Sequence, residues 1–341
     1  MPLKKLAVYT LGTIFLVWLF AQIGSVNAFI KTVKMLAYRE QGELLRYGGA
    51  SGTAPITKKQ KEELYNRIEQ AAKAHRQAPI NAKIDRVWKA IPGLNGREVD
   101  VEKTYKLALD RGETEPISFV YREIPPRISL DDLPPNPIYR GNPHKPMVAL
   151  MVNVAWGNEY IAPLLRTLAD ANVRATFFLD GTWLSKNERT AREMLRQGHE
   201  LSNHGYSHKN MSKLAAAQAE YEIVRTEQLL SGLGVKNALF APPSGDFSAE
   251  TVQLAAKHGL KTILWTLDTV DWKNPAPETI IRKITRGLEP GSLILLHPTA
   301  ASAKALPELI QNIKNKGLVI GTVSDLISPR RVPEVEAPID F

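Results

Sequence analysis

The carboxyl-terminal half of the chain alternates short apolar runs with amphipathic stretches of helical periodicity. The apolar runs have the length of strands and are Val148–Val152, Thr176–Leu179, Leu239–Ala241, Thr262–Leu264 and Leu293–Leu296. The amphipathic stretches are Tyr160–Ala171, Asn187–Gln197, Ala217–Leu233, Ala249–His258, Pro277–Gly287 and Ala301–Lys316. Strand–helix alternation predicts parallel strands with right-handed crossovers, so we expect an α/β barrel or a doubly wound sheet over residues 147–328.

The preceding part of the chain has a different pattern. Residues 29–79 form a predicted linker followed by a polar helical stretch. Over residues 80–133, short alternating runs are separated by Pro-Gly and Asn-Gly turns, which predicts a small α+β domain. Prolines gather in residues 134–146, a predicted linker, and residues 329–341 form a tail.

The amino terminus predicts export. Lys4 and Lys5 precede Leu6–Ile23, which is free of charge and long enough for a short membrane-spanning helix. Val26–Ala28 resembles a cleavage site, so a signal peptide within residues 1–28 is the alternative to an anchor. Either interpretation places the remainder outside the cytoplasm, attached to the membrane or secreted.

Charge and cysteine content narrow the partners and the chemistry. Lys and Arg total 44 against 35 Asp and Glu, a net charge of +9, which suits nucleic acid, a membrane surface or an anionic wall, or only aids solubility. No Lys/Arg run interleaved with aromatic residues is present, so we expect no nucleic-acid partner. The chain has no cysteine, so a metal would need His, Asp, Glu or backbone oxygen ligands. The sequence gives no oligomeric state.

Polar clusters follow three of the predicted strands. His204 and His208 follow a predicted strand at Gly198–Ser202 and are four residues apart. On one helical turn their imidazoles would face the same way and share a metal, although a surface pair has the same spacing. Asp268–Trp272 follows another strand, and His297 follows a third. Because the carboxyl ends of parallel strands meet at one edge, we expect these groups to lie together.

These clusters resemble motifs of a known family. Met147–Ile327 is similar to the polysaccharide deacetylase domain, also called the NodB-homology or carbohydrate esterase family 4 fold, which implies a distorted (β/α)7-type barrel. The segments that resemble its motifs are Arg174–Phe178, Ser202–His208, Ala241–Gly245, Asp268–Trp272 and Leu293–His297.

The first motif of the family, Thr-Phe-Asp-Asp-Gly, is altered. Met151–Tyr160 resembles the variant found in sporulation-associated members of the YlxY type. In that alignment Asn153 falls where the family has its base Asp, and Val154 falls where it has a metal-ligand Asp. Ala241 replaces the Arg that pairs with the base, and the two losses agree because a buried Arg without its carboxylate would be an unpaired charge.

The resemblance implies metal-assisted hydrolysis of N-acetyl groups on cell-wall glycan, a reaction at a non-peptide carbon–nitrogen bond. His204 and His208 would bind a divalent metal, with zinc expected, and His297, oriented by Asp271, would protonate the leaving amine. Asn153 has no basic group and would offer only its carbonyl oxygen as a weak ligand. The residues expected to contact the sugar are Trp272, Pro243 and Tyr206. Asp180, after the second strand, is a candidate to replace the missing carboxylate.

Two hypotheses about function follow. The first is a metal-dependent deacetylase of peptidoglycan-like glycan, in sporulation, either active or impaired by the substitutions at 153, 154 and 241. The second is a pseudoenzyme that binds cell-wall glycan without turnover. Residues 80–133 resemble peptidoglycan-binding modules found beside cell-wall enzymes, with an unrelated structural subdomain as the alternative.

Overall fold

The structure is a computed structural model that describes residues 56–112 and 117–332. The chain divides into two compact units, residues 1–62 and 63–341. In the first, the described residues are 56–62, where helix α3 (Lys58–Ala74) begins. The predicted anchor or signal peptide lies outside the described residues. Among the helices that the structure does describe, none has the length and apolar character needed to cross a bilayer.

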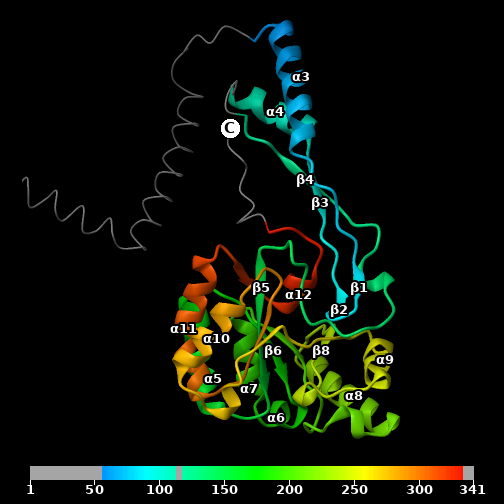
Figure 1. Ribbon diagram of the computed structural model, residues 1–341, viewed down its shortest axis with the longest axis vertical. Coiled ribbons are helices and arrows are strands. Elements are labelled where there is room, and N and C mark those ends of the chain that lie inside the picture. The colour runs from blue at the N-terminus through cyan, green and yellow to red at the C-terminus, as the bar shows by residue number, and fades with distance from the viewer. Residues whose placement is uncertain (1–55, 113–116, 333–341) are drawn as a thin grey trace, which may run out of the picture. The chain divides into compact units, whose positions relative to one another are not determined.

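The second unit contains a curled parallel sheet of eight strands (Figure 1). Its hydrogen-bonded order is β10-β11-β5-β6-β7-β8-β9, and β12 also pairs with β5. The strands are β5 (Met147–Val154), β6 (Thr176–Leu179), β7 (Glu200–Asn203), β8 (Leu239–Phe240), β9 (Lys261–Thr262), β10 (Leu267–Asp268), β11 (Leu293–Leu296) and β12 (Val319–Gly321). The α/β prediction is confirmed, but the sheet is a half-barrel, because no ladder joins β9 to β10 within the described residues.

Helices cover the outer surface of this sheet. They are α5 (Asn158–Asp170), α6 (Gly181–Lys186), α7 (Glu188–Arg196), α8 (Ala216–Gly232), α9 (Ala249–Lys257), α10 (Pro277–Gly287) and α11 (Ala300–Asn315). Helix α12 (Val323–Ile327) packs instead in the apolar cluster that contains Met151 and Phe178. Short 3₁₀ turns lie at Leu130–Asp132, Met211–Lys213, Pro243–Gly245 and Asp271–Lys273.

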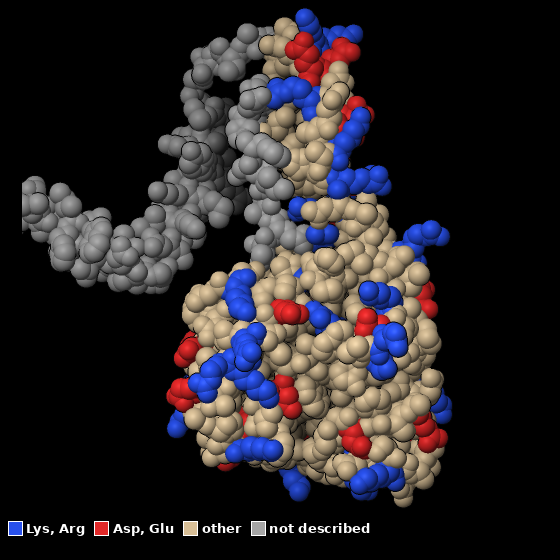
Figure 2. Space-filling model, viewed as in Figure 1, with Lys and Arg blue, Asp and Glu red and all other residues tan. Residues whose placement is uncertain are grey.

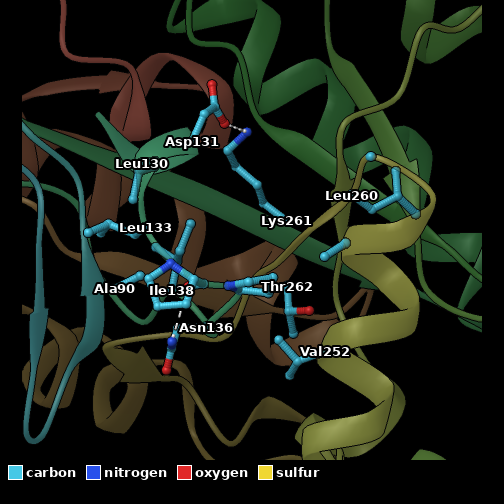
Figure 3. Close-up of a pocket in the computed structure, with 14 residues that line it drawn as sticks. Ala90, Leu130, Asp131, Leu133, Asn136, Ile138, Val252, Leu260, Lys261 and Thr262 are labelled. Atoms are coloured by element: carbon cyan, nitrogen blue, oxygen red, sulfur yellow. Dashed lines mark hydrogen bonds and ion pairs between the residues drawn. The ribbon is translucent and has the colours of Figure 1, made fainter. Parts of the chain in front are cut away.

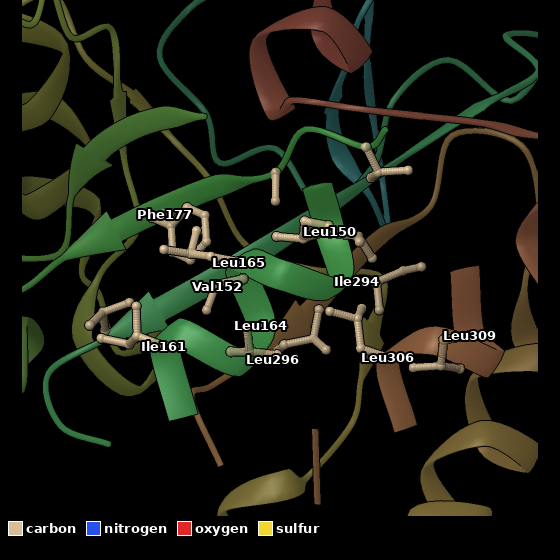
Figure 4. Packing of buried hydrophobic residues seen from close by; sticks show 14 of the residues in the cluster. Leu150, Val152, Ile161, Leu164, Leu165, Phe177, Ile294, Leu296, Leu306 and Leu309 are labelled. Atoms are coloured by element: carbon tan, nitrogen blue, oxygen red, sulfur yellow. The ribbon is translucent and has the colours of Figure 1, made fainter. Parts of the chain in front are cut away.

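Side chains on β5 show how the sheet divides its core. Val152 packs outward with Leu164 of α5 and Leu306 of α11 in the largest apolar cluster (Figure 4). Met151, the next residue back, packs in a second cluster with Phe178 on the concave side. Successive side chains of a strand point to opposite faces, so this strand, buried on both faces, is apolar throughout until Asn153.

The residues before the sheet form the predicted mixture of helix and strand. Two antiparallel pairs are present, β1 (Lys83–Asp85) with β2 (Lys89–Ile91) and β3 (Gly96–Val99) with β4 (Tyr121–Ile124). Helix α4 (Val101–Arg111) begins at Asp100, whose carboxylate accepts from the Lys103 backbone N–H, and ends at the left-handed Gly112. These are ordinary amino- and carboxyl-terminal helix caps.

The Pro-rich segment 134–146 is packed against the sheet instead of forming a free linker. Ile138 is buried, donates its backbone N–H to the Thr262 carbonyl at 2.8 Å and accepts from the Leu264 N–H at 2.8 Å. Asn142 is also buried and donates its side-chain N–H to the Pro92 carbonyl at 2.9 Å. The segment therefore lies beside β9, next to the opening in the half-barrel.

Candidate active site

A cavity of about 420 Å³ lies at the carboxyl ends of the strands, where the sequence analysis expected the site. It is bordered by residues that follow β5, β7, β8, β10 and β11. Its lining residues are Asn153, Ala155, Trp156, His204, His208, Ser244, Trp265, Asp268, Trp272, Leu295 and His297. The predicted residues Asn153, His204, His208, Trp272 and His297 are thus brought together, although their chain positions span 145 residues (from 153 to 297, both included).

One side of the cavity has a complete set of hydrogen bonds around Asp271. This carboxylate is fully buried, and it accepts from His297 Nδ1 at 2.7 Å and from the His297 backbone N–H at 2.6 Å. Ser302 of α11 also donates its hydroxyl to it. Because Nδ1–H is bound to the carboxylate, His297 presents Nε2 to the cavity, the atom that would hold or release a proton.

A loop, and not a helical turn, brings His204 and His208 together. Residues 204–208 have no helix, and Gly205 and His208 have positive φ angles of 73° and 53°. The two imidazole centroids are nevertheless 5.2 Å apart, with the planes inclined by 68°. The prediction of proximity is right, but its reasoning from helical spacing is wrong.

Glu222 of α8, which the sequence analysis missed, holds this loop. Its carboxylate is buried and accepts from the Tyr206 N–H at 2.9 Å, the Ser207 N–H at 2.6 Å and the Ser207 hydroxyl at 2.6 Å. Lys209 Nζ lies 3.5 Å away as its cation. A carboxylate with several backbone donors fixes the loop, and only the tertiary contact between α8 and the loop reveals it.

His204 is held as a neutral ring. It is buried, its Nδ1–H donates to the Ala241 carbonyl at 2.7 Å, and burial lowers its pKa to about 3, with the nearby His208 acting in the same direction. The hydrogen bond at Nδ1 leaves the Nε2 lone pair free, which is the arrangement of a metal-binding histidine.

The end of β5 forms the opposite side of the cavity and lacks carboxylates. Asn153 is buried, and its Oδ1 has no hydrogen-bond partner. Val154, which the sequence analysis aligned with the metal-ligand Asp, packs outward in the large apolar cluster and does not line the cavity. Ala155 lines the cavity instead. Successive side chains of a strand point to opposite faces, so Ala155 points to the same face as Asn153. At this end of β5 the cavity is therefore bordered by Asn153 and Ala155, and neither is a carboxylate.

The residues present do not fit a hydrolytic metal centre. Such a centre uses three protein ligands and keeps one position open. Among the described residues, no group of three or more His, Asp or Glu side chains is placed to bind an ion together. His204 and His208 provide two imidazole ligands, and Ala155 has no donor atom that could be the third ligand. These residues therefore do not form the metal centre that such a hydrolysis needs.

Asp180 does not replace the missing carboxylate. It caps α6, where its Oδ1 accepts from the Trp183 backbone N–H at 2.8 Å and from the Thr182 hydroxyl. Burial raises the pKa of Asp180. The hydrogen bonds from Thr182 and Trp183 and the nearby His208 lower it in part. Its Oδ2 is buried without a partner, but Asp180 is not among the residues that line the cavity.

Three tryptophans line the cavity. Trp272 is 55% exposed and Trp156 is 44% exposed, and the Trp156 indole is stacked on the His297 imidazole at 5.8 Å and 7°. Trp265 is the third. The sequence analysis predicted only Trp272. Apolar ring faces beside polar groups are suited to sugars, which present both kinds of surface.

Tyr206 and Pro243, the other predicted sugar contacts, do not line this cavity. The Tyr206 ring packs against Tyr221 of α8, with centroids 5.9 Å apart, and Arg225 lies over it. Pro243 is buried beneath the loop, where its Cγ would lie 3.1 Å from a Cβ added at Gly205. Pro243 therefore packs against the histidine loop, and the Tyr206 side chain of that loop packs on α8.

A separate hollow of about 220 Å³ lies between the segment 130–138 and helix α9 (Figure 3). Leu130, Ile138 and Val252 line it, and at its edge Lys261 Nζ lies 2.7 Å from Asp131 Oδ1. It contains none of the predicted site residues. The candidate active site is therefore the cavity at the carboxyl ends of the strands.

Comparison with known proteins agrees with the motifs. A family model described as polysaccharide deacetylase matches residues 140–263. The uncharacterized protein YlxY of Bacillus subtilis is 41% identical over 295 residues, which cover 86% of this chain and 92% of YlxY. The chain belongs to the polysaccharide deacetylase family. The resemblance on which the sequence analysis relied is therefore confirmed.

Relatives within the polysaccharide deacetylase family differ in activity. A peptidoglycan-N-acetylglucosamine deacetylase of Bacillus cereus is 32% identical and covers 52% of this chain and 67% of the relative. The crystal structure of BA3943 from Bacillus anthracis, described as a pseudoenzyme of carbohydrate esterase family 4, has a TM-score of 0.74 and 40% identity, covering 79% of this chain and 96% of BA3943. A BA3943 mutant described as having restored enzymatic activity also has a TM-score of 0.74, with 38% identity and coverage of 79% and 99%.

Proposed function

We propose that this polysaccharide deacetylase family member binds N-acetylated, peptidoglycan-like cell-wall glycan in the cavity without hydrolysing it efficiently. The observation that favours the second hypothesis is the end of β5. Asn153 and Ala155 border the cavity there, and neither side chain has a carboxylate that could act as a base or as the anionic ligand of a metal site. The likeness to BA3943, itself described as a pseudoenzyme, supports the same conclusion.

The retained groups suit binding. Trp156 and Trp272 offer exposed ring faces, and His297 Nε2 offers a polar contact for an acetamide or a hydroxyl.

The proposal extends to location. Lys4 and Lys5 before Leu6–Ile23 support export with an anchor or a cleaved signal peptide, which would bring the cavity to the cell wall. The resemblance of Met151–Tyr160 to sporulation-associated members supports a role in the wall of the sporulating cell. On the face shown in Figure 2, Lys and Arg are interspersed with Asp and Glu, which agrees with glycan better than with nucleic acid as the partner.

Weak hydrolysis is the second candidate function. The intact Asp271–His297 pair favours it, because His297 Nε2 is placed to protonate a leaving amine. Water activation is the step for which the residues are missing, and losing a positioned base lowers rates by about 10²–10⁴-fold.

One experiment separates the two functions. Retention on purified peptidoglycan and affinity for N-acetylglucosamine oligosaccharides are measured with EDTA, and amine release is measured with added Zn²⁺. Binding in EDTA with no release above a His204→Ala control is the expected result. Release above that control would establish the deacetylase, and failure to bind would refute the glycan-binding proposal. Metal content of the purified protein tests directly whether two imidazoles retain an ion.

A further inference from the structure

A cavity of about 840 Å³ lies at the amino ends of the strands, at the opposite edge of the sheet from the candidate active site. Met147 begins β5 and Val319–Gly321 forms β12, while Arg174 and Gln197 shortly precede β6 and β7, and all of them line this cavity. It shares no lining residue with the active-site cavity. The two cavities are therefore separate.

Cationic side chains dominate the lining of this amino-end cavity. Five Lys or Arg residues line it against two carboxylates, an excess of three positive charges. The cations are Lys145, Arg174, Lys314, Arg330 and Arg331, and the carboxylates are Glu123 and Asp325. A concave surface in which one sign of charge prevails concentrates its electric field, so this cavity attracts anions.

Both carboxylates already accept hydrogen bonds from the protein itself. Asp325 forms the capping box of α12 and accepts from the Thr322 hydroxyl at 2.8 Å. Glu123 accepts from Asn95 Nδ2 at 2.6 Å and from the Arg331 backbone N–H at 3.2 Å. The two acidic side chains are therefore held by local structure, and the cavity keeps its positive excess.

Three of the cations are exposed and retain donors for a ligand. They are Arg174, Lys314 and Arg330. Arg174 Nη2 lies 3.5 Å from Asp325 Oδ2, and Lys314 Nζ donates to the Ala171 carbonyl at 2.8 Å. A guanidinium has five N–H donors and an ammonium has three, so these contacts leave further donors on both side chains.

A buried lysine fixes the wall of the cavity. Lys145 Nζ donates to the carbonyls of Asp325 and Ser328, at the end of α12. A cation is favourable beside the last carbonyls of a helix. The backbone that leads to Arg330 and Arg331 is thereby held beside the start of β5, so this wall is formed before any ligand binds.

The other lining residues select among anions. Met147, Leu318, Val319 and Ile320 are aliphatic, and none of the residues that line the cavity, all within the described ranges, is aromatic. Single-stranded nucleic acid is bound by aromatic rings on which its bases stack. A polymer of phosphate groups joined by short polyols has no ring to stack. Its phosphates suit Lys and Arg, and its carbon atoms suit the aliphatic residues.

We propose that the amino-end cavity binds an anionic polymer of phosphodiester-linked polyols, with the phosphate groups on Arg174, Lys314 and Arg330. This site does not depend on the glycan-binding function proposed above. With both cavities occupied, the protein would hold a glycan chain at one edge of its sheet and an anionic polymer at the other.

The test compares anions in the full chain. Affinity for poly(glycerol phosphate), for inorganic phosphate and for an oligodeoxythymidylate of equal charge is measured by titration calorimetry. The proteins are the unaltered chain, the double variant Lys314→Gln/Arg330→Gln, and the matched control Arg189→Gln/Lys213→Gln. The control removes the same charge from two exposed positions that do not line the cavity, and all four positions are exposed, so folding is not expected to suffer.

The double variant should bind poly(glycerol phosphate) about tenfold more weakly, which is ~1.4 kcal/mol, and the control should bind it as the unaltered chain does. Added salt should weaken binding to the unaltered chain, because it screens exposed charges. No binding by the unaltered chain, equal binding by the double variant, or an equal loss in the control would each refute the site.

The other anions test the identity of the ligand. Tighter binding of the oligodeoxythymidylate would refute a polyol phosphate as the preferred ligand, and equal affinity for inorganic phosphate would refute a polymer. Affinity for N-acetylglucosamine oligosaccharides, measured in parallel, should be the same in all three proteins. The amino-end site can therefore fail while glycan binding stands, and glycan binding can fail while this site stands.

Discussion

The two sides of the cavity differ in how completely their polar groups are satisfied. At β10 and β11, Asp271 accepts three hydrogen bonds from His297 and Ser302. At β5, Asn153 Oδ1 is buried without a partner, and Ala155 has no polar group. The side that would handle the leaving group is intact, and the side that would activate water is not. A hydrogen-bonded carboxylate inside the core contributes to folding, so it is retained even where the chemistry around it has lost its other half.

The largest expected effect comes from rebuilding the deficient side. The double variant Asn153→Asp/Ala155→Asp would give the cavity a base and, beside the two imidazoles, an anionic third ligand. We expect amine release from chitooligosaccharide with Zn²⁺ to rise by about 10²–10⁴-fold, the range for a positioned base. The control is the Asn153→Asp/Ala155→Asn variant, whose side chain at position 155 has nearly the same volume but no carboxylate. A folded double variant without activity would show that the deficiency lies elsewhere.

Breaking the intact side should affect stability. Asp271→Asn would place an amide where three donors converge, and we expect the free energy of unfolding to fall by about 2–3 kcal/mol. Asp268→Asn, in the same loop but half-buried with one backbone hydrogen bond, is the matched control and should change it by less than about 1 kcal/mol. Urea unfolding measures both. Equal effects would mean that Asp271 is no more important to folding than its neighbour.

Lowering the pH should destabilise the fold through His199, which lies at the amino end of β7, away from both sides of the cavity. Burial lowers the pKa of His199 to about 4, with Arg174 acting in the same direction, whereas an unfolded histidine has a pKa of about 6.5. The unfolded chain takes up the proton first, so stability is complete above about pH 6.5 and decreases as the pH falls toward 4.

His199→Gln should remove about 2 kcal/mol of this dependence, as measured by urea unfolding at pH 7 and pH 4.5. If the variant kept the full dependence, another group would be responsible. Once the contribution of His199 to the pH dependence of stability is known, any loss of glycan binding at low pH can be assigned to the cavity or to the fold as a whole.

The smallest expected effect concerns the exposed indole of Trp272. Trp272→Ala should weaken binding of N-acetylglucosamine and of its tetramer alike, by about fivefold to tenfold, which is ~1–1.4 kcal/mol. Titration calorimetry measures this change, and Tyr221→Ala, an equally exposed aromatic residue outside the cavity, is the control. No change in Trp272→Ala would exclude this residue from the sugar contact.

The periodicity of the sequence located most of the sheet and its outer helices. The predicted runs at Thr176–Leu179 and Leu293–Leu296 coincide with β6 and β11 because buried strands need uninterrupted apolar residues. The two-residue strand β10, the strand β12 and the helix α12 were not predicted, since such short elements depend on neighbours for their hydrogen bonds. The packing of Ile138 beside β9 was also missed, because its Pro-rich surroundings indicate a linker.

For the site, the sequence determined which chemical groups are available: two histidines in one short segment, an Asp-Trp motif, a strand-end His and an Asn in place of a carboxylate. Tertiary structure alone decided which of them face the same space. The alternation along β5 turned Val154 outward and Ala155 inward, the α8 carboxylate of Glu222 fixed the histidine loop, and a glycine pressed against Pro298 placed Trp156 on His297. Side-chain direction depends on backbone conformation and on distant contacts, which residue order does not contain.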